Sequence, residues 1–387
     1  MLSGQRMAAY NELKVSELKG KEVVNVSRIF NFNAGPAALP LEVLEEVQAE
    51  LLDFNNTGMS ILEISHRSPA FEKVLEETKQ DIKDLLNLPD DYGIFFMGGG
   101  GSLQFSCVPY NFLKGGMTAA YADTGSFADK AFEEAEKVGK AVKVFSSKAR
   151  GYDRVPRPEE VKLPENCAYL HITGNNTIEG TEYFVYPETG DVPLVADMSS
   201  EILSRPFPVE KFSLIYSGAQ KNIGPAGVVL IIAKKDYVAG RDKKLPVMMN
   251  YETILNKDSL YNTPPVFAIY IVGKVAKWLK KQGGLAAMEA VNRKKAALLY
   301  ALLDKYPEFY KGRATKDSRS IMNVTFNLGS KELEAKFVEE GKQRGLGGLK
   351  GHRSVGGIRA SIYNAMPLAG CEALAQFMED FYQNNKA

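Results

Sequence analysis

Hydrophobic residues in the first two thirds of the chain form short continuous runs that alternate with longer amphipathic stretches. The apolar runs predict buried strands at 94–97, 168–172, 194–196, 214–216 and 228–232. Stretches with apolar residues at helical spacing predict helices at 41–54, 71–86 and 128–138. Because the strands are apolar at successive positions, we expect a sheet covered on both faces, with helices joining mainly parallel strands. This pattern predicts an α/β domain.

The pattern changes after Pro264 and Pro265. Helices are predicted at 266–282, 285–305, 333–344 and 371–382, and strands near 322–326 and 358–362. This mixture indicates a smaller α+β domain. We therefore expect an N-terminal extension at 1–30, a large domain at 31–270 and a small C-terminal domain at 271–387. The first residues of the large domain are expected to pack on the small one.

Length and charge narrow the class of protein. A chain of 387 residues is too long for one core, and its 45% apolar and 25% charged residues are ordinary for a soluble enzyme. The formal net charge of +1 argues against a nucleic-acid or membrane-binding surface. The sequence contains no run of about 18 apolar residues, so we expect no membrane span. The extension lacks the apolar core of a secretory signal, so we expect a cytoplasmic protein and leave an organellar address open.

The cysteines support an intracellular setting. Cys107, Cys167 and Cys371 are far apart and form no CxxC pair. They therefore indicate neither a disulfide framework nor a zinc site, and no metal is expected. A reducing compartment fits this usage.

Two of the predicted strands lead into an acid and an amine. The strand at 194–196 runs into Asp197, and the strand at 214–216 leads, through small residues, to Lys221. Pyridoxal phosphate needs a lysine for its Schiff base and a carboxylate beside its pyridinium nitrogen. Taken singly, Lys221 could be a surface lysine and Asp197 a helix cap. Together with a glycine-rich loop upstream, they favour the cofactor.

That loop follows the strand at 94–97. Four glycines, Gly98 to Gly101, precede Ser102 and the start of a helix. Unpaired backbone N–H groups and the helix dipole make such a turn suitable for a phosphate. The dinucleotide pattern fails because Leu103 occupies its third glycine position, and no Gly-Lys-Ser/Thr follows for a P-loop. A flexible turn remains the alternative.

Further polar and aromatic candidates surround this framework. Phe127 follows a small-residue turn and could lie on a cofactor ring, although a core position is the alternative. The polar segment 171–177 ends another strand. Two His-Arg pairs and one isolated arginine could bind the anionic groups of a substrate, or could be solvated surface side chains. They are His66-Arg67, His352-Arg353 and Arg359.

Taken together, the motifs resemble those of the phosphoserine aminotransferases, which are class V members of the fold-type I pyridoxal-phosphate enzymes. The resemblance covers about residue 30 to the C-terminus. Its motifs are Asn31 to Ala37, Ser65-His66-Arg67, Asp197 to Ser200, Gly218 to Asn222, Tyr261 to Pro265 and Gly351 to Arg359. It implies a large domain with a mainly parallel, seven-stranded-type sheet covered by helices, plus a smaller α+β domain.

The resemblance implies a role for each matching residue around pyridoxal 5'-phosphate. Lys221 would form the Schiff base, Asp197 would pair with the ring nitrogen, Phe127 would stack on the ring, and Thr177 would lie near its 3-hydroxyl. The family usually has tryptophan at the stacking position. The cofactor phosphate would be held by Gly101, Ser102 and Gln220, and by Asn262 and Thr263 of the neighbouring subunit of a homodimer.

For the substrate, the resemblance implies that Arg359 binds the α-carboxylate. The substrate phosphate would be held by His66, Arg67, His352 and Arg353. The implied reaction is reversible transfer of the amino group of glutamate to 3-phosphohydroxypyruvate, giving O-phospho-L-serine and 2-oxoglutarate in serine biosynthesis. The alternatives are another class V aminotransferase for small substrates, a cysteine desulfurase-like enzyme, and a non-catalytic binding protein that kept the fold.

Overall fold

The computed structural model describes residues 28–386. Its centre is a sheet whose seven strands lie in the order β2-β10-β9-β8-β5-β3-β4. Only β10 runs against its neighbours, and every other pairing in this sheet is parallel. In the same order, the strands span Tyr92–Met97, Val229–Lys234, Leu214–Gly218, Leu194–Asp197, Cys167–Thr173, Thr118–Asp123 and Ala141–Ser146.

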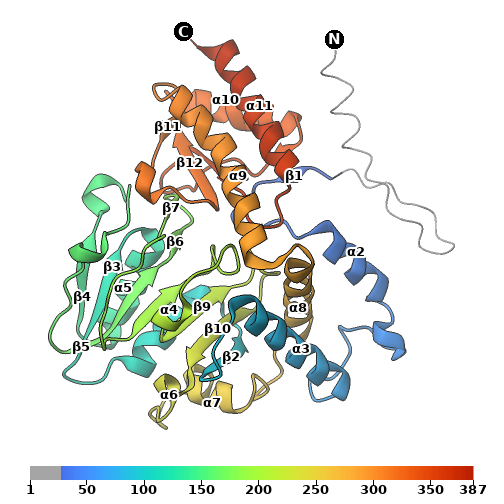
Figure 1. Cartoon of the computed structure of the whole chain (residues 1–387), viewed down its shortest axis with the longest axis vertical. Coiled ribbons are helices and arrows are strands. Elements are labelled where there is room, and N and C mark those ends of the chain that lie inside the picture. The colour runs from blue at the N-terminus through green and yellow to red at the C-terminus, as the bar shows by residue number, and fades with distance from the viewer. Residues whose placement is uncertain (1–27, 387) are drawn as a thin grey trace.

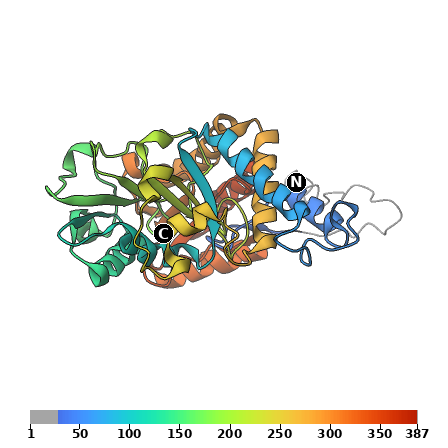
Figure 2. The ribbon, with the colours of Figure 1, turned by 90° about the horizontal axis from the view of Figure 1, so that it is seen from below.

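Helices cover both faces of this sheet. One apolar cluster joins the sheet to α2 (Leu41–Glu50), α3 (Pro69–Leu86) and α8 (Val266–Lys281). A second cluster joins the other face to α4 (Gly100–Phe112), α5 (Ser126–Val138), α6 (Lys235–Val238) and α7 (Tyr251–Asn256). Ala196 belongs to the first cluster and its neighbour Val195 to the second, as expected for a strand buried on both faces. Helices α3 and α8 lie side by side in Figures 1 and 2.

A third apolar cluster holds together the C-terminal part, which is coloured orange to red in Figure 1. It contains residues of β12 (Asn323–Asn327), β14 (Ile358–Ser361), α10 (Lys331–Gln343) and α11 (Leu368–Asn385). The short exposed strand β11 (Lys311–Gly312) pairs with the outer edge of β12. Helix α9 (Gly284–Lys305) contributes to this cluster and to the first one. Strand β1 (Phe30–Asn31) pairs with β13 (Leu346–Gly347), so the first described residues lie against the C-terminal part.

The predicted mainly parallel sheet, covered on both faces, is confirmed, and so are its five predicted strands. The predicted helix at 41–54 is too long, because α2 ends at Glu50. The chain then enters the short 3-10 helix Phe54–Asn56, in which Asn55 and Asn56 adopt positive φ angles of 53° and 59°. Asparagine tolerates this left-handed conformation. The helical repeat is already broken before it, because Asp53 is extended, with φ −145° and ψ 93°, and an α-helix cannot continue through that conformation. The boundary near residue 270 stays a prediction, and most of the extension at 1–30 lies outside the described residues.

Candidate active site

The carboxyl ends of the parallel strands bring the acid and the amine to one edge of the sheet. Strand β8 ends at Asp197, and its parallel neighbour β9 ends at Gly218, three residues before Lys221. Ligands of open α/β sheets commonly bind at this edge. Two residues predicted from separate strands therefore lie in one region.

Lys221 is partly buried and makes two contacts that define its surroundings. Its Nζ donates a hydrogen bond to Oγ1 of Thr177 at 2.7 Å and lies 5.0 Å from the ring centroid of Phe127. Burial lowers the pKa of Lys221, and nearby Arg359 lowers it further, while the carboxylates of Asp197 and Glu179 oppose the change. At a given pH, a larger fraction of Lys221 is therefore present as the neutral amine than of a free lysine.

Asp197 is held by the segment that follows it. Its Oδ1 accepts hydrogen bonds from the backbone N–H of Ser199 at 2.9 Å and from the Ser199 hydroxyl at 2.6 Å. Ser199 Oγ in turn accepts the backbone N–H of Gly218 at 3.0 Å, which ties β8 to β9. Both hydrogen bonds use Oδ1, so Oδ2 can accept a proton donor such as a pyridinium nitrogen. The carboxylate is 6% exposed, and burial strengthens such a pairing.

The glycine run leads from β2 into α4 and meets the same cluster. Gly99 and Gly100 have φ angles of 84° and 66°, which disfavour other residues. A Cβ atom on Gly101 would lie 3.7 Å from Oγ of Ser199, so the loop passes close to the segment that holds Asp197. Helix α4 has 13 residues, and its N-terminal N–H groups are suited to a phosphate. Ser102 lies in its first turn.

Gln220 joins this edge to the N-terminal part of the chain. Its backbone carbonyl accepts the N–H of Ala37 at 2.9 Å. Its side chain folds back toward Gly218, where a Cβ atom would lie 2.8 Å from Oε1. This close approach explains why a glycine ends β9.

A group of cationic side chains lies close to His352. Arg359 on β14 points Nη1 toward the carbonyl of Thr177 at 3.5 Å, while its buried Nε has no partner among the described residues. Burial lowers the pKa of His352, and the neighbouring cations Arg359, Arg353 and Lys130 lower it further. Several positive charges this close together repel one another unless a bound anion offsets them, so the arrangement favours an anionic ligand.

Lys130 was missed in the sequence analysis. It lies on α5, one turn after Phe127, with Nζ 5.5 Å from the centroid of that ring. The spacing of three residues between an aromatic and a lysine on a helix was the available signal, because such residues share one face. Exposed lysines at that spacing are common, so the signal alone was weak.

Four of the predicted residues are not joined to this cluster. His66, Arg67, Asn262 and Thr263 make no hydrogen bond or ion pair with Lys221, Asp197 or Arg359 in the described chain. Arg67, Asn262 and Thr263 are exposed, while the buried Nε2 of His66 has no partner within residues 28–386.

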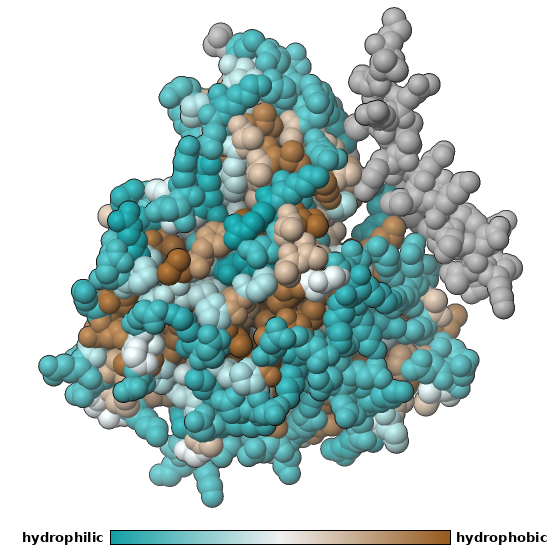
Figure 3. Space-filling model, in the orientation of Figure 1, coloured by the Kyte–Doolittle hydropathy of each residue, from teal (hydrophilic) through white to brown (hydrophobic). Residues whose placement is uncertain are grey.

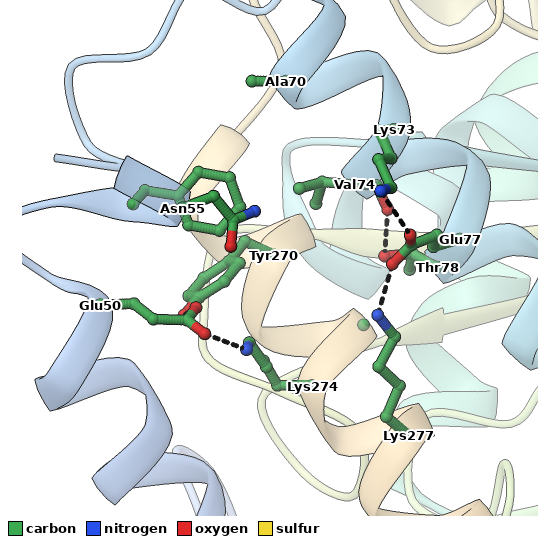
Figure 4. A pocket seen from close by; sticks show the side chains of 12 residues that line it. Glu50, Asn55, Ala70, Lys73, Val74, Glu77, Thr78, Tyr270, Lys274 and Lys277 are labelled. Carbon is green, nitrogen blue, oxygen red and sulfur yellow. Dashed lines mark hydrogen bonds and ion pairs between the residues drawn. The ribbon is translucent and has the colours of Figure 1, made fainter. Parts of the chain in front are cut away.

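A separate cavity of about 240 Å³ lies between α2, α3 and α8 (Figure 4). Three of its lysines face two glutamates there: Lys274 Nζ lies 2.8 Å from Glu50 Oε1, Lys73 Nζ lies 3.8 Å from Glu77 Oε1, and Lys277 also pairs with Glu77. These pairs neutralise most of the local charge. Lys274–Glu50 links α8 to α2 and Lys277–Glu77 links α8 to α3, so the ion pairs join the three helices around the cavity.

Two further findings concern metals and membranes. Within residues 28–386, no group of three or more His, Cys, Asp or Glu side chains could hold a metal ion. None of the helices described there combines the length and apolarity that crossing a bilayer requires.

Comparison with known proteins identifies the family. Residues 29–374 match the family described as Aminotransferase class-V. The chain belongs to the class-V aminotransferase family. This confirms the resemblance found in the sequence.

Two curated relatives of this class-V aminotransferase are named phosphoserine aminotransferases. The phosphoserine aminotransferase of Niallia circulans is 53% identical over 354 residues, covering 92% of this chain and 98% of the relative. The phosphoserine aminotransferase of Desulfatibacillum aliphaticivorans is 55% identical over 361 residues, covering 93% and 99%.

Solved structures agree with the fold. A phosphoserine aminotransferase from Bacillus circulans subsp. alkalophilus has a TM-score of 0.91 and 52% identity, covering 93% of this chain and 99% of that chain. A pyridoxal-phosphate-bound phosphoserine aminotransferase from Trichomonas vaginalis has a TM-score of 0.87 and 39% identity, covering 91% and 100%. The predicted fold class is therefore confirmed.

Proposed function

We propose that this chain is a pyridoxal-phosphate-dependent phosphoserine aminotransferase. It transfers the amino group of glutamate to 3-phosphohydroxypyruvate and serves serine biosynthesis. The observation that carries the proposal is the position of Lys221, between Thr177 and Phe127 and within the field of Asp197, beside a cationic group that suits a doubly anionic substrate. The names of its relatives support the same substrate.

The residues at the site fit the cofactor. Lys221 supplies an amine, Asp197 a buried carboxylate with Oδ2 available, Phe127 an aromatic face and Thr177 a hydroxyl. Gly101 and Ser102 at the start of α4 would hold the cofactor phosphate, together with Gln220. Pyridoxal phosphate, when bound, supplies an electron sink for the substrate Cα.

The residues of the chain then move a proton and orient the substrate. With the cofactor bound, Lys221 Nζ would move a proton from the substrate Cα to the cofactor carbon C4′, and in the opposite direction in the second half-reaction; its lowered pKa suits it to accept that proton. Thr177 orients that amine, and Asp197 keeps a bound ring nitrogen protonated. Arg359 binds the α-carboxylate with its two-pronged guanidinium.

The substrate phosphate is assigned to the remaining cations. His352 and Arg353 lie near Arg359 in the same chain, and we add Lys130 to them. We assign His66 and Arg67 to this set from the neighbouring subunit, since within residues 28–386 neither makes a hydrogen bond or ion pair with Lys221 or Arg359. The substrate phosphate has enough charge and enough oxygen atoms to bind several cationic side chains at once.

A desulfurase activity is disfavoured by the cysteines. Cys107, Cys167 and Cys371 are all buried, and burial raises the pKa of Cys107 and Cys371 to about 12. A reactive cysteine needs an accessible thiolate. Three free cysteines also support the cytoplasm as the compartment.

Adding the two proposed substrates one after the other tests the proposed function. The holo-protein is expected to lose its visible absorbance band when glutamate is added and to regain it with 3-phosphohydroxypyruvate, because each half-reaction transfers one amino group. Stopped-flow absorbance measures both steps. If the visible absorbance does not change with glutamate but changes with cysteine, and sulfur is released, the proposal is overturned in favour of a desulfurase.

The active site is proposed to be shared in a homodimer. Asn262 and Thr263 are exposed, and the apolar Tyr261 beside them is 44% exposed. Leu62, four residues before His66, is 61% exposed. Apolar patches also remain on the largely hydrophilic face in Figure 3. Exposed apolar residues next to predicted site residues favour a surface that a second copy covers.

Mixed dimers test the shared site. One chain carries Lys221→Ala and the other carries Asn262→Asp with Thr263→Ala, and each homodimer is expected to be nearly inactive. In a mixed dimer one site collects every defect and the other is intact, so random reassortment should restore roughly a quarter of full activity. Activity is measured after the chains are mixed, denatured and refolded. If mixed dimers form, shown by native mass spectrometry, and activity stays near zero, the site is not shared.

A further inference from the structure

Glu179 is a buried carboxylate at the site that neither the sequence analysis nor the proposed mechanism uses. It lies in the turn between β6 (Asn175–Asn176) and β7 (Thr181–Glu182) and is 1% exposed. Its Oε1 accepts hydrogen bonds from the backbone N–H of Ser126 at 2.9 Å and from the Ser126 hydroxyl at 2.6 Å. Ser126 is the first residue of α5.

These hydrogen bonds supply a cap that α5 lacks locally. Gly125 holds the N-cap position and provides no side-chain hydrogen bond. A carboxylate 53 positions away in the sequence satisfies one of the unpaired N–H groups instead and interacts favourably with the positive end of the helix dipole. The start of α5 is therefore fixed by Glu179.

The contact is also close-packed. A Cβ atom on residue 125 would lie 2.7 Å from Glu179 Oε2 and 2.5 Å from Asn176 Oδ1, so any other residue there would have to displace these two side chains. The turn is anchored from the other side, where the hydroxyl of Thr325 donates to the Glu179 carbonyl at 2.7 Å. Thr325 lies on β12, opposite Arg359 of β14. Glu179 thus connects the start of α5 with the strand pair that carries Arg359.

What α5 positions is Phe127, the residue directly after Ser126, whose ring centroid lies 5.0 Å from Lys221 Nζ. We propose that Glu179 is a positioning residue that fixes Phe127 against the cofactor ring by capping α5 through Ser126. It acts through Phe127 and does not touch the substrate. The inference rests on the proposed function, because it assigns the binding of pyridoxal phosphate to this site.

A double-mutant cycle tests the proposal without relying on activity. The dissociation constant of pyridoxal phosphate is measured by titrating the cofactor-free protein, for the parent, Glu179→Ala, Phe127→Ala and the double variant. Losing a charge-assisted cap is expected to weaken binding by about 10- to 100-fold in the parent. In the Phe127→Ala background the same change should weaken binding by less than about twofold, because residues that act as a unit are not additive.

Two conservative variants and one control complete the design. Glu179→Gln keeps an acceptor for the Ser126 N–H and should recover most of the affinity. Ser126→Ala removes one hydrogen bond and should give a smaller loss in the same direction, which carries the test if Glu179→Ala does not fold. Glu182→Gln alters a buried carboxylate of the same hairpin that binds Arg205 and Ile321; it should lower the melting temperature and show no coupling to Phe127.

The outcomes separate the two proposals. A parent protein that does not bind pyridoxal phosphate would overturn the proposed function. A parent that binds it, with Glu179→Ala within about twofold of the parent or equally harmful with and without Phe127, would overturn only the positioning role of Glu179.

Discussion

Replacing Lys221 with alanine is expected to lower kcat by at least about 10²- to 10⁴-fold, which is the rate enhancement that a positioned general acid–base group typically supplies. The Nζ atom is held by Thr177, and burial lowers its pKa. Among the described residues, Lys221 is the only lysine in contact with Thr177. One other lysine, Lys130, contacts the Phe127 ring. The fold should persist, because the side chain makes one hydrogen bond. Steady-state kinetics and circular dichroism measure the two effects.

A second buried lysine provides the matched control. Lys295 is 0% exposed, and burial lowers its pKa to about 8. Its Nζ donates to the carbonyls of Ile362, Tyr363 and Met366, so its role is to hold the chain after β14. Lys295→Met should lower the melting temperature and leave kcat within several-fold of the parent. Lys221→Ala with kcat within tenfold of the parent would refute the assignment.

The comparison of these lysines shows what a shifted pKa can and cannot identify. Both side chains are buried and both pKa values are lowered. Only Lys221 lies at the carboxyl edge of the parallel strands, with a hydroxyl and an aromatic ring beside its amine. Geometry therefore separates the catalytic candidate from the structural one.

The sequence predicted the central strands because they are strongly apolar and buried on both faces. It did not predict β3 or β4. Strand β3 is fully buried, but three of its six residues are alanines, which give a weak hydrophobic signal. Strand β4 lies at the edge of the sheet and is only partly buried, so its pattern is mixed. Tertiary position decides both strands.

The same limit applies to the site. Lys221 and Asp197 were recognisable because each follows an apolar strand. Glu179 was not, because its role depends on a contact with Ser126 that only the folded chain creates. Whether Asn262 and Thr263 reach a neighbouring site depends on a second chain, and neither the sequence nor one folded chain contains that information.

Phosphoserine is expected to be preferred over serine by about 10²- to 10⁴-fold in kcat/KM. A hydrogen bond to a charged group contributes roughly 1.5–3 kcal/mol, and two such interactions with the phosphate add to about 3–6 kcal/mol at about 1.4 kcal/mol per factor of ten. Serine leaves the cations near His352 without their partner, which widens the gap. The preference should depend on salt, because Arg353 is exposed.

A variant separates this preference from catalysis. Arg353→Ala should lower kcat/KM for phosphoserine more than that for glutamate, since a phosphate dianion carries more charge than the γ-carboxylate of glutamate. Arg359→Ala should impair both donors, because both carry an α-carboxylate.

Phosphoserine aminotransferase activity is best tested by kcat/KM for O-phosphoserine and for serine as amino donors to 2-oxoglutarate, determined on the same holo-protein. We expect glutamate to form from both donors, with a ratio of at least about 10² in favour of phosphoserine. A ratio near one, or no glutamate formed from phosphoserine, would contradict this expectation.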